Sequence, residues 1–152
     1  MHLLKGSSMR LTTHTDYGLR VLMSLAVMDR LATIEELAGR HGISRNHLMK
    51  VVQTLVGLGM VKGIRGRKGG VALARPAEDI RIGQVVRMLE SDTGLVACLA
   101  CPPTGCVFIG LCRLTSAFHG AMEAFFKELD RLTLADLVLN RSAVQKRLEL
   151  AS

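Results

Sequence analysis

The fold is decided by residues 33–74, whose sequence is TIEELAGRHGISRNHLMKVVQTLVGLGMVKGIRGRKGGVALA. The opening letters TIEE are a capping-box pattern, which predicts a helix from Ile34 to about His41 that a glycine ends. Ser44 is placed to cap a second helix over residues 45–58. Two short helices joined by a glycine-containing turn are typical of a helix-turn-helix, although a plain helical hairpin has the same pattern.

The next part of this stretch predicts a β-hairpin. Residues 60–64 and 70–74 have the composition of two strands, and Arg65-Gly66-Arg67-Lys68-Gly69 lies between them. The glycines permit the positive φ angles of a tight turn, and the cations suit contact with phosphates or a minor groove. A solvated charged hairpin is the plainer alternative. Directly after a helix pair, however, such a hairpin indicates a winged helix that binds DNA.

Apolar spacing extends the prediction over the rest of the chain. Helices are expected at about 15–29, 82–90 and 113–132, followed by a short helix that Thr133 caps. The long helix carries apolar residues at steps of three and four, which suits either packing on its own domain or a dimer seam. The expected fold class is mainly α with a small β wing, a winged helix-turn-helix plus a long C-terminal dimerisation helix. The expected segments are a leader or expression remnant (1–8), a DNA-binding domain (9–90), a cysteine loop (91–112), a dimerisation helix with a short final helix (113–140) and a loose tail (141–152).

Composition narrows the class of protein. An apolar fraction of 49% supports a packed core, and a net charge of +7 suits a polyanionic partner. No apolar run approaches the roughly 20 residues that cross a bilayer, and the first residues lack a signal-peptide core. We therefore expect a cytoplasmic protein with no membrane partner. Since neither a nucleotide loop nor a paired acid–base constellation is present, we do not expect an enzyme.

The second half of the chain holds a dense group of thiols, at Cys98, Cys101, Cys106 and Cys112. In a reducing compartment, clustered cysteines more often bind metal or react than form structural disulfides. The spacing fits a tetrahedral zinc site, an iron–sulfur site or a thiol switch, and it lacks the bacterial ferredoxin run. Spacing alone leaves these three possibilities open.

Several segments together resemble the IscR/NsrR/RirA family of iron–sulfur winged-helix regulators. The resemblance runs from Met9 to about Val138 and rests on MRLT…TDYGLR, SRNHLMKVV and RGRKGGV. The segments LVAC, CRL and TLADL are most similar to the NsrR branch, whose members are nitric-oxide-sensing repressors.

The resemblance implies an iron–sulfur cluster, with 4Fe–4S favoured over 2Fe–2S. By position, the family's three cysteines match Cys98, Cys106 and Cys112, while Cys101 departs from the pattern and is an alternative first ligand. A family aspartate that completes the cluster from the partner subunit matches Asp16. An ordinary helix carboxylate stabilised by the macrodipole is the alternative. Arg20, one turn further on, is expected to pair with that carboxylate or to lie near the anionic cluster, and a plain surface cation is the alternative.

The sequence thus predicts a homodimeric repressor of double-stranded operator DNA that nitric oxide releases from its site. The expected DNA contacts come from the start of the second helix and from the hairpin tip: Ser44, Arg45, Asn46, His47, Lys50, Arg65, Arg67 and Lys68. Ser44 alternatively only caps its helix. The competing functions are an iron- or cluster-status sensor of the same family, and a cluster-free winged-helix regulator with a thiol switch or zinc.

Overall fold

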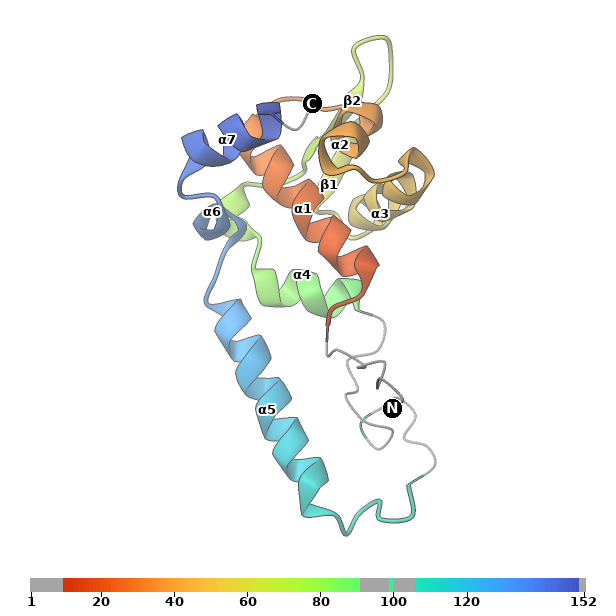
Figure 1. Cartoon of the computed structure of the whole chain (residues 1–152), viewed down its shortest axis with the longest axis vertical. Helices are drawn as coiled ribbons and strands as arrows, with labels where there is room; N and C mark the ends of the chain where they lie inside the picture. The colour runs from red at the N-terminus through yellow and green to blue at the C-terminus, as the bar shows by residue number, and fades with distance from the viewer. Residues whose placement is uncertain (1–9, 91–98, 100–105, 151–152) are drawn as a thin grey trace, which may run out of the picture.

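The computed structural model of the 152-residue chain describes residues 10–90, 99 and 106–150. The observed elements, in chain order, are α1 (Thr13–Met28), α2 (Ile34–His41), α3 (Arg45–Gly57), β1 (Val61–Ile64), β2 (Gly70–Leu73), the 3-10 turn η1 (Ala77–Asp79), α4 (Ile82–Leu89), α5 (Arg113–Asp130), α6 (Leu134–Leu137) and α7 (Arg141–Leu150). The structure confirms the predicted fold class, because the chain is mainly helical and carries a small antiparallel sheet of two strands. Figure 1 shows this hairpin and α5 at opposite ends of the molecule.

Local capping explains where the first helices begin and end. The Thr12 hydroxyl accepts a hydrogen bond from the backbone N–H of Thr15 at 3.2 Å, so α1 starts two residues before the predicted position. The Thr33 hydroxyl accepts from the N–H of Glu36 at 3.0 Å, and α2 has the predicted bounds. Gly42 ends α2 with a φ of 63°, a conformation that few residues other than glycine adopt.

The hydrophobic core is organised around α1, which crosses the centre of the domain and contacts α2, α3, α4, α6 and α7 (Figure 1). Val21 and Leu22 of α1 are fully buried, and so are Leu48 and Leu55 of α3. Because the apolar side chains of α3 are held in the core, the polar residues at its start remain at the surface.

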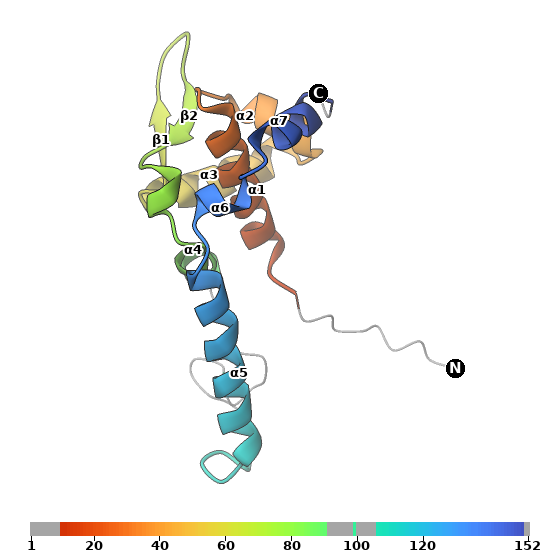
Figure 2. The same cartoon turned by 90° about the vertical axis from the view of Figure 1, so that its left-hand side faces the viewer.

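The hairpin is held against the helices by backbone hydrogen bonds as well as by packing. Its strands pair antiparallel from Val61↔Leu73 to Ile64↔Gly70. Ala32, between α1 and α2, exchanges two backbone hydrogen bonds with Val71, at 3.0 and 2.8 Å. The base of the hairpin is therefore fixed to the helix-turn-helix, while its tip extends beyond the body (Figure 2).

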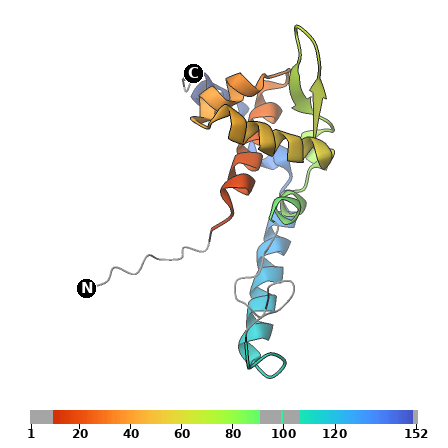
Figure 3. The ribbon, with the colours of Figure 1, turned by 90° about the vertical axis from the view of Figure 1, so that its right-hand side faces the viewer.

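Helix α5 leaves the domain as an arm that only its C-terminal end joins to the core (Figure 3). Phe126 is its one buried residue, with 9% of its surface exposed, and Met122 and Leu129 pack against the core. Phe125, another apolar residue of this helix, is 42% exposed. One side of α5 therefore packs on its own domain near the C-terminal end of the helix, and an apolar side chain on another side faces solvent.

The expected loose tail is a helix. Asn140 accepts a hydrogen bond from the N–H of Ala143 at 3.3 Å at the start of α7. Arg141 donates to the carbonyl of Val27 at 3.2 Å, and Arg40 donates to the carbonyl of Leu148 at the far end. The two arginine contacts join residues more than a hundred positions apart, so a local sequence pattern does not predict them.

Candidate nucleic-acid interface and cysteine loop

The start of α3 presents the residues that we expected to face DNA. The Ser44 hydroxyl accepts a hydrogen bond from the N–H of His47 at 3.3 Å, so Ser44 is the N-cap of the helix. Asn46 and Lys50 are exposed, and neither side chain forms a hydrogen bond or ion pair with the part of the chain that the structure describes. Two polar side chains on adjacent turns are therefore available to a ligand outside the domain.

Arg45 lies at the same end of α3 but already has a partner. Its guanidinium forms an ion pair with Glu35 of α2, and both side chains are more than half exposed. This hydrogen bond holds the pKa of Glu35 below its usual range. Because the pair is exposed to solvent and weak, Arg45 can exchange Glu35 for a phosphate or a base edge at small cost.

His47 has a second role, which the sequence did not indicate. Its ring lies 5.0 Å, centroid to centroid, from the ring of Tyr17 in α1, with the planes at 66°. Arg20 lies over the same tyrosine, 5.9 Å from the ring centroid. Since His47 is half-buried, it fixes the start of α3 against α1 as well as lying beside the expected DNA contacts.

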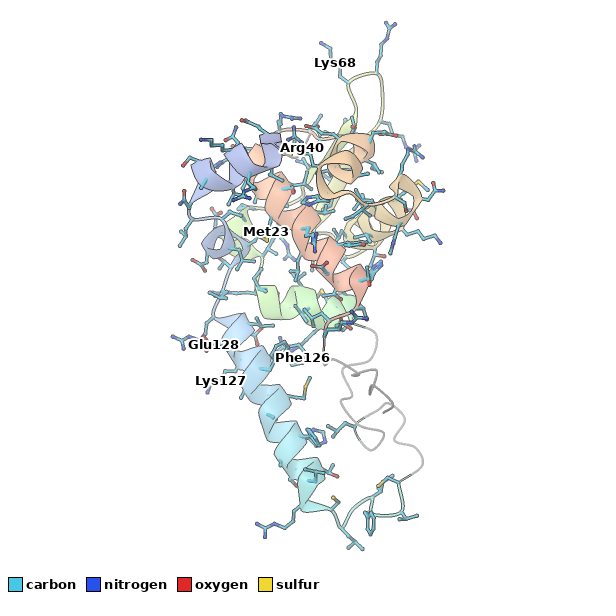
Figure 4. The ribbon with its side chains drawn as sticks, viewed as in Figure 1. Met23, Arg40, Lys68, Phe126, Lys127 and Glu128 are labelled. Atoms are coloured by element: carbon cyan, nitrogen blue, oxygen red, sulfur yellow. The ribbon has the colours of Figure 1, made fainter. Side chains whose placement is uncertain are left out.

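The hairpin tip carries the remaining cations that we expected to contact DNA. Arg65, Arg67 and Lys68 are exposed and form no ion pair with any residue in the described ranges. The turn needs Gly66, whose φ is 121°, and it closes with a hydrogen bond from Gly69 N–H to the Gly66 carbonyl at 2.9 Å. Figure 4 shows Lys68 extending from the tip, away from the body of the molecule. A tip of this kind can approach a polyanion without first breaking contacts within its own domain.

Asp16 and Arg20 are neighbours on one face of α1. Their side chains form an ion pair, with Nη2 and Oδ2 at 2.8 Å, and each is 47% exposed. The pairing of Arg20 with Asp16, one of the roles expected for it, is thus present in the structure. The carboxylate faces solvent on the first turn of its helix, where a group from outside the domain can reach it.

The cysteine loop is described only at its C-terminal end. Cys106 and Cys112 are free thiols, and both are half-buried. A hydrogen bond from the N–H of Cys112 to the carbonyl of Phe108 at 3.1 Å folds the segment between them into a turn. Cys98 and Cys101 lie outside the described residues.

Cys112 is the N-cap of α5, and its side chain makes no capping hydrogen bond. The N–H groups at a helix N-terminus favour negative charge, so this position suits a thiolate ligand. No group of three or more metal-ligating side chains is found among the residues that the structure describes. Cys106 and Cys112 are therefore the two described thiols that could hold a metal group as thiolates.

Comparison with known proteins agrees with this fold. Residues 11–140 match the Rrf2 family, described as iron-dependent transcriptional regulators. The HTH-type transcriptional regulator NsrR of Geobacillus kaustophilus is 43% identical over 143 residues, which cover 93% of this chain and 97% of that protein. NsrR of Bacillus subtilis is 43% identical over 144 residues, covering 93% and 99%. Among solved structures, IscR of T. potens superposes with a TM-score of 0.71 at 26% identity, covering 91% of this chain and 92% of that one.

These relatives are transcription regulators rather than enzymes, as the sequence predicted. Within the described part of the chain, no helix has both the length and the apolar character needed to cross a bilayer. The match spans the helix-turn-helix, the hairpin and α5, so it covers every element described above as part of the site. The chain therefore belongs to the Rrf2 family of transcriptional regulators.

Proposed function

We propose that this regulator is a repressor that binds operator DNA as an iron–sulfur-loaded homodimer and leaves it when nitric oxide attacks the cluster. Genes for nitric-oxide detoxification would then be expressed. The observation that carries the proposal is the pair of free thiols Cys106 and Cys112, of which Cys112 is the N-cap of the long helix of a DNA-binding domain and Cys106 lies in the segment just before it. The similarity to proteins named NsrR supports nitric oxide as the effector.

DNA binding would use the two exposed regions of the domain. The start of α3 enters the major groove, where Asn46 and Arg45 are suited to base edges and Lys50 to a phosphate. Arg67 and Lys68 of the hairpin hold phosphates or the minor groove. The exposed positions of these side chains support this assignment.

Dimerisation would use the side of α5 that its own domain leaves uncovered. Leu114 is 59% exposed and Phe125 is 42% exposed, and Phe118 and Ala121 lie between them at helical steps of three and four. A helix whose apolar side chains face solvent in this pattern is suited to pair with a second copy. A two-fold dimer would in turn present two α3 helices to a palindromic operator.

A cluster would be held by Cys98, Cys106 and Cys112, or with Cys101 as first ligand, and by Asp16 of the partner subunit. We favour 4Fe–4S over 2Fe–2S. When bound, the cluster supplies the iron that nitric oxide attacks. Asp16, when not held by a cluster, would pair with Arg20 of its own α1, as in the ion pair at 2.8 Å. Tyr17 beside it packs on His47, and this contact would couple the same face of α1 to the start of α3.

An anaerobic visible spectrum with iron and sulfide analysis, titrated with nitric oxide and followed by operator binding, tests the proposal. We expect an iron–sulfur absorption that a few equivalents of nitric oxide bleach, together with loss of DNA binding. The variant Cys106→Ser should lose the absorption while its domain remains folded. A protein whose DNA binding follows iron supply but ignores nitric oxide would instead be an iron-status sensor. A colourless protein with zinc or no metal would be a cluster-free regulator with structural or redox-active thiols.

A further inference from the structure

A cavity of about 530 Å³ lies on a part of the domain that the proposed function does not use. It is bounded by the C-terminal end of α1, the base of the β1–β2 hairpin, the turn η1 and the first residue of α7. Lys62 and Ala72 face each other across the two strands, and both line it. Its volume is in the range of cavities that hold small molecules.

The cavity contains an arginine whose hydrogen bonding is incomplete. Arg75 is half-buried, and its Nε is fully buried without a hydrogen-bond partner among the described residues. A buried donor that lacks a partner is unfavourable, and such groups are rare in folded proteins. The terminal nitrogens of Arg75 are not buried in this way and form no hydrogen bond within the described ranges, so they are the atoms that an acceptor from outside the protein can reach.

The other cations that line the cavity differ in whether they have an ion-pair partner. Arg141 is paired with Asp29 at 3.4 Å and donates to the Val27 carbonyl at 3.2 Å. Arg30 is held by Glu36. Lys62 is exposed and makes no hydrogen bond or ion pair within the described ranges. Arg75 and Lys62 are thus the two lining cations whose charge no carboxylate satisfies.

The rest of the lining sets the shape and character of a ligand. Leu25, Leu73 and Ala77 supply apolar surface beside the two cations. The acids Asp29 and Glu78 are exposed at the lining, and Asp29 faces Arg141. A planar carboxylate matches the donor geometry of a guanidinium, and the apolar side chains suit a small hydrocarbon body.

We propose that this cavity binds a small organic carboxylate, with its head on Arg75 and Lys62 and its apolar body against Leu25, Leu73 and Ala77. The site goes beyond the proposed function, since it uses neither the cysteine loop nor Asp16. An occupant would contact both α1 and the two hairpin strands, so it would alter how the hairpin is held. DNA phosphates are the less suitable occupant, because neither the residues of α3 nor the tip residues 65–68 line the cavity.

The test is an amide NMR titration of the full-length protein, without DNA, with benzoate as the probe. We expect saturable shifts at the amides of Lys62, Ala72 and Ala77. Benzyl alcohol has the same ring without the charge and should bind at least about tenfold more weakly. Arg75→Gln should weaken benzoate binding by about tenfold, and Arg75→Lys by less. Arg147→Gln removes one exposed α7 cation outside the lining and should leave benzoate binding unchanged.

Three results would overturn the proposal. The first is the absence of saturable shifts at the lining amides. The second is equal affinity for benzoate and benzyl alcohol, or for benzoate in the native protein and a folded Arg75→Gln variant. The third is an Arg75→Gln variant that loses salt-dependent affinity for DNA, because Arg75 would then contact phosphates of the duplex. The benzoate titrations need neither a cluster nor nitric oxide, so their failure is separate from failure of the proposed function.

Discussion

Arg87 in α4 and Asp130 at the end of α5 form a two-pronged ion pair, with Nη1–Oδ1 at 2.8 Å and Nη2–Oδ2 at 2.7 Å. The hydrogen bond from Arg87 holds the pKa of Asp130 below its usual range. Arg87 also lies over the ring of Phe126, 4.4 Å from its centroid. Figure 4 shows Phe126 on the side of α5 that faces α4. The direction in which α5 leaves the domain is therefore fixed at this contact.

The close approach of Asp130 to α4 leaves no space for a side chain at Gly83. A Cβ at this position would overlap the carboxylate of Asp130, so Gly83→Ala must displace the end of α5. We expect the free energy of unfolding to fall by about 1–3 kcal/mol in urea denaturation. The matched control is Gly39→Ala in α2, where a Cβ meets open space and a gain of up to about 1 kcal/mol is expected. Equal stabilities for the two variants would contradict the close approach.

His41 makes the stability of the domain depend on pH. Its Nε2 lies 2.8 Å from the hydroxyl of buried Ser24, and burial, followed by the charge of Arg20, lowers the pKa of His41 from its ordinary value of 6.5. The unfolded chain therefore binds this proton at a higher pH than the folded chain does. The contribution of His41 to stability is complete above pH 6.5 and is lost as the pH falls toward the folded pKa.

The measurement is Tm from about pH 7.5 to about pH 5. We expect His41→Gln to flatten the decline in Tm below pH 6.5. Asp16 and Arg40 also act on His41 and are unchanged in this variant. His119→Gln, at an exposed position of α5, should leave the native decline in place. A parallel decline in the native protein and in His41→Gln would rule out the assignment.

The sequence predicts those features of the fold and the site that depend on interactions between residues close together in the chain. The bounds of α2 and the position of the hairpin were predicted, because caps and turn glycines act within a few residues. Which side of α5 packs on the domain was left open by the apolar steps, because it depends on how α5 crosses α4. The pairing of His47 with Tyr17 was not predicted, because it depends on the crossing of α1 and α3.

Base contacts and phosphate contacts should respond differently to substitution. Arg67→Ala in the hairpin should weaken binding to all DNA sequences alike and reduce the slope of log K against log salt by about one. Asn46→Ala should cost about 1–3 kcal/mol on the operator and much less on unrelated DNA. Fluorescence anisotropy at several salt concentrations separates the two effects.

Lys127→Ala is the control for these DNA measurements. This cation is exposed on α5, and Figure 4 shows it far from Lys68 at the hairpin tip. Its removal should change neither affinity nor salt slope. If Arg67→Ala lowered affinity only for the operator, the hairpin would read sequence rather than hold phosphates.

The exposed apolar side of α5 should control oligomeric state. Phe125→Ser removes an aromatic ring that is 42% exposed and does not belong to the domain core, so the monomer should keep its fold. If the proposed dimer forms through α5, this variant sediments as a monomer at concentrations where the native protein sediments as a dimer. Glu123→Ser, at another exposed position of the same helix, should remain dimeric. A Phe125→Ser protein that stays dimeric would place the interface elsewhere.

Asp16 and Arg20 allow the role of the carboxylate to be separated from the role of the ion pair. Both Asp16→Ala and Arg20→Ala abolish the contact at 2.8 Å, but only the first removes a possible cluster ligand. Since each side chain is 47% exposed, the lost pair is worth at most about 1 kcal/mol, and both variants should fold. We expect Asp16→Ala to change the visible spectrum of the loaded protein or its rate of reaction with nitric oxide. Arg20→Ala should keep the native spectrum. If both variants match the native protein in spectrum and in reaction rate, Asp16 is an ordinary helix carboxylate, and its ion pair with Arg20 is the whole of its role.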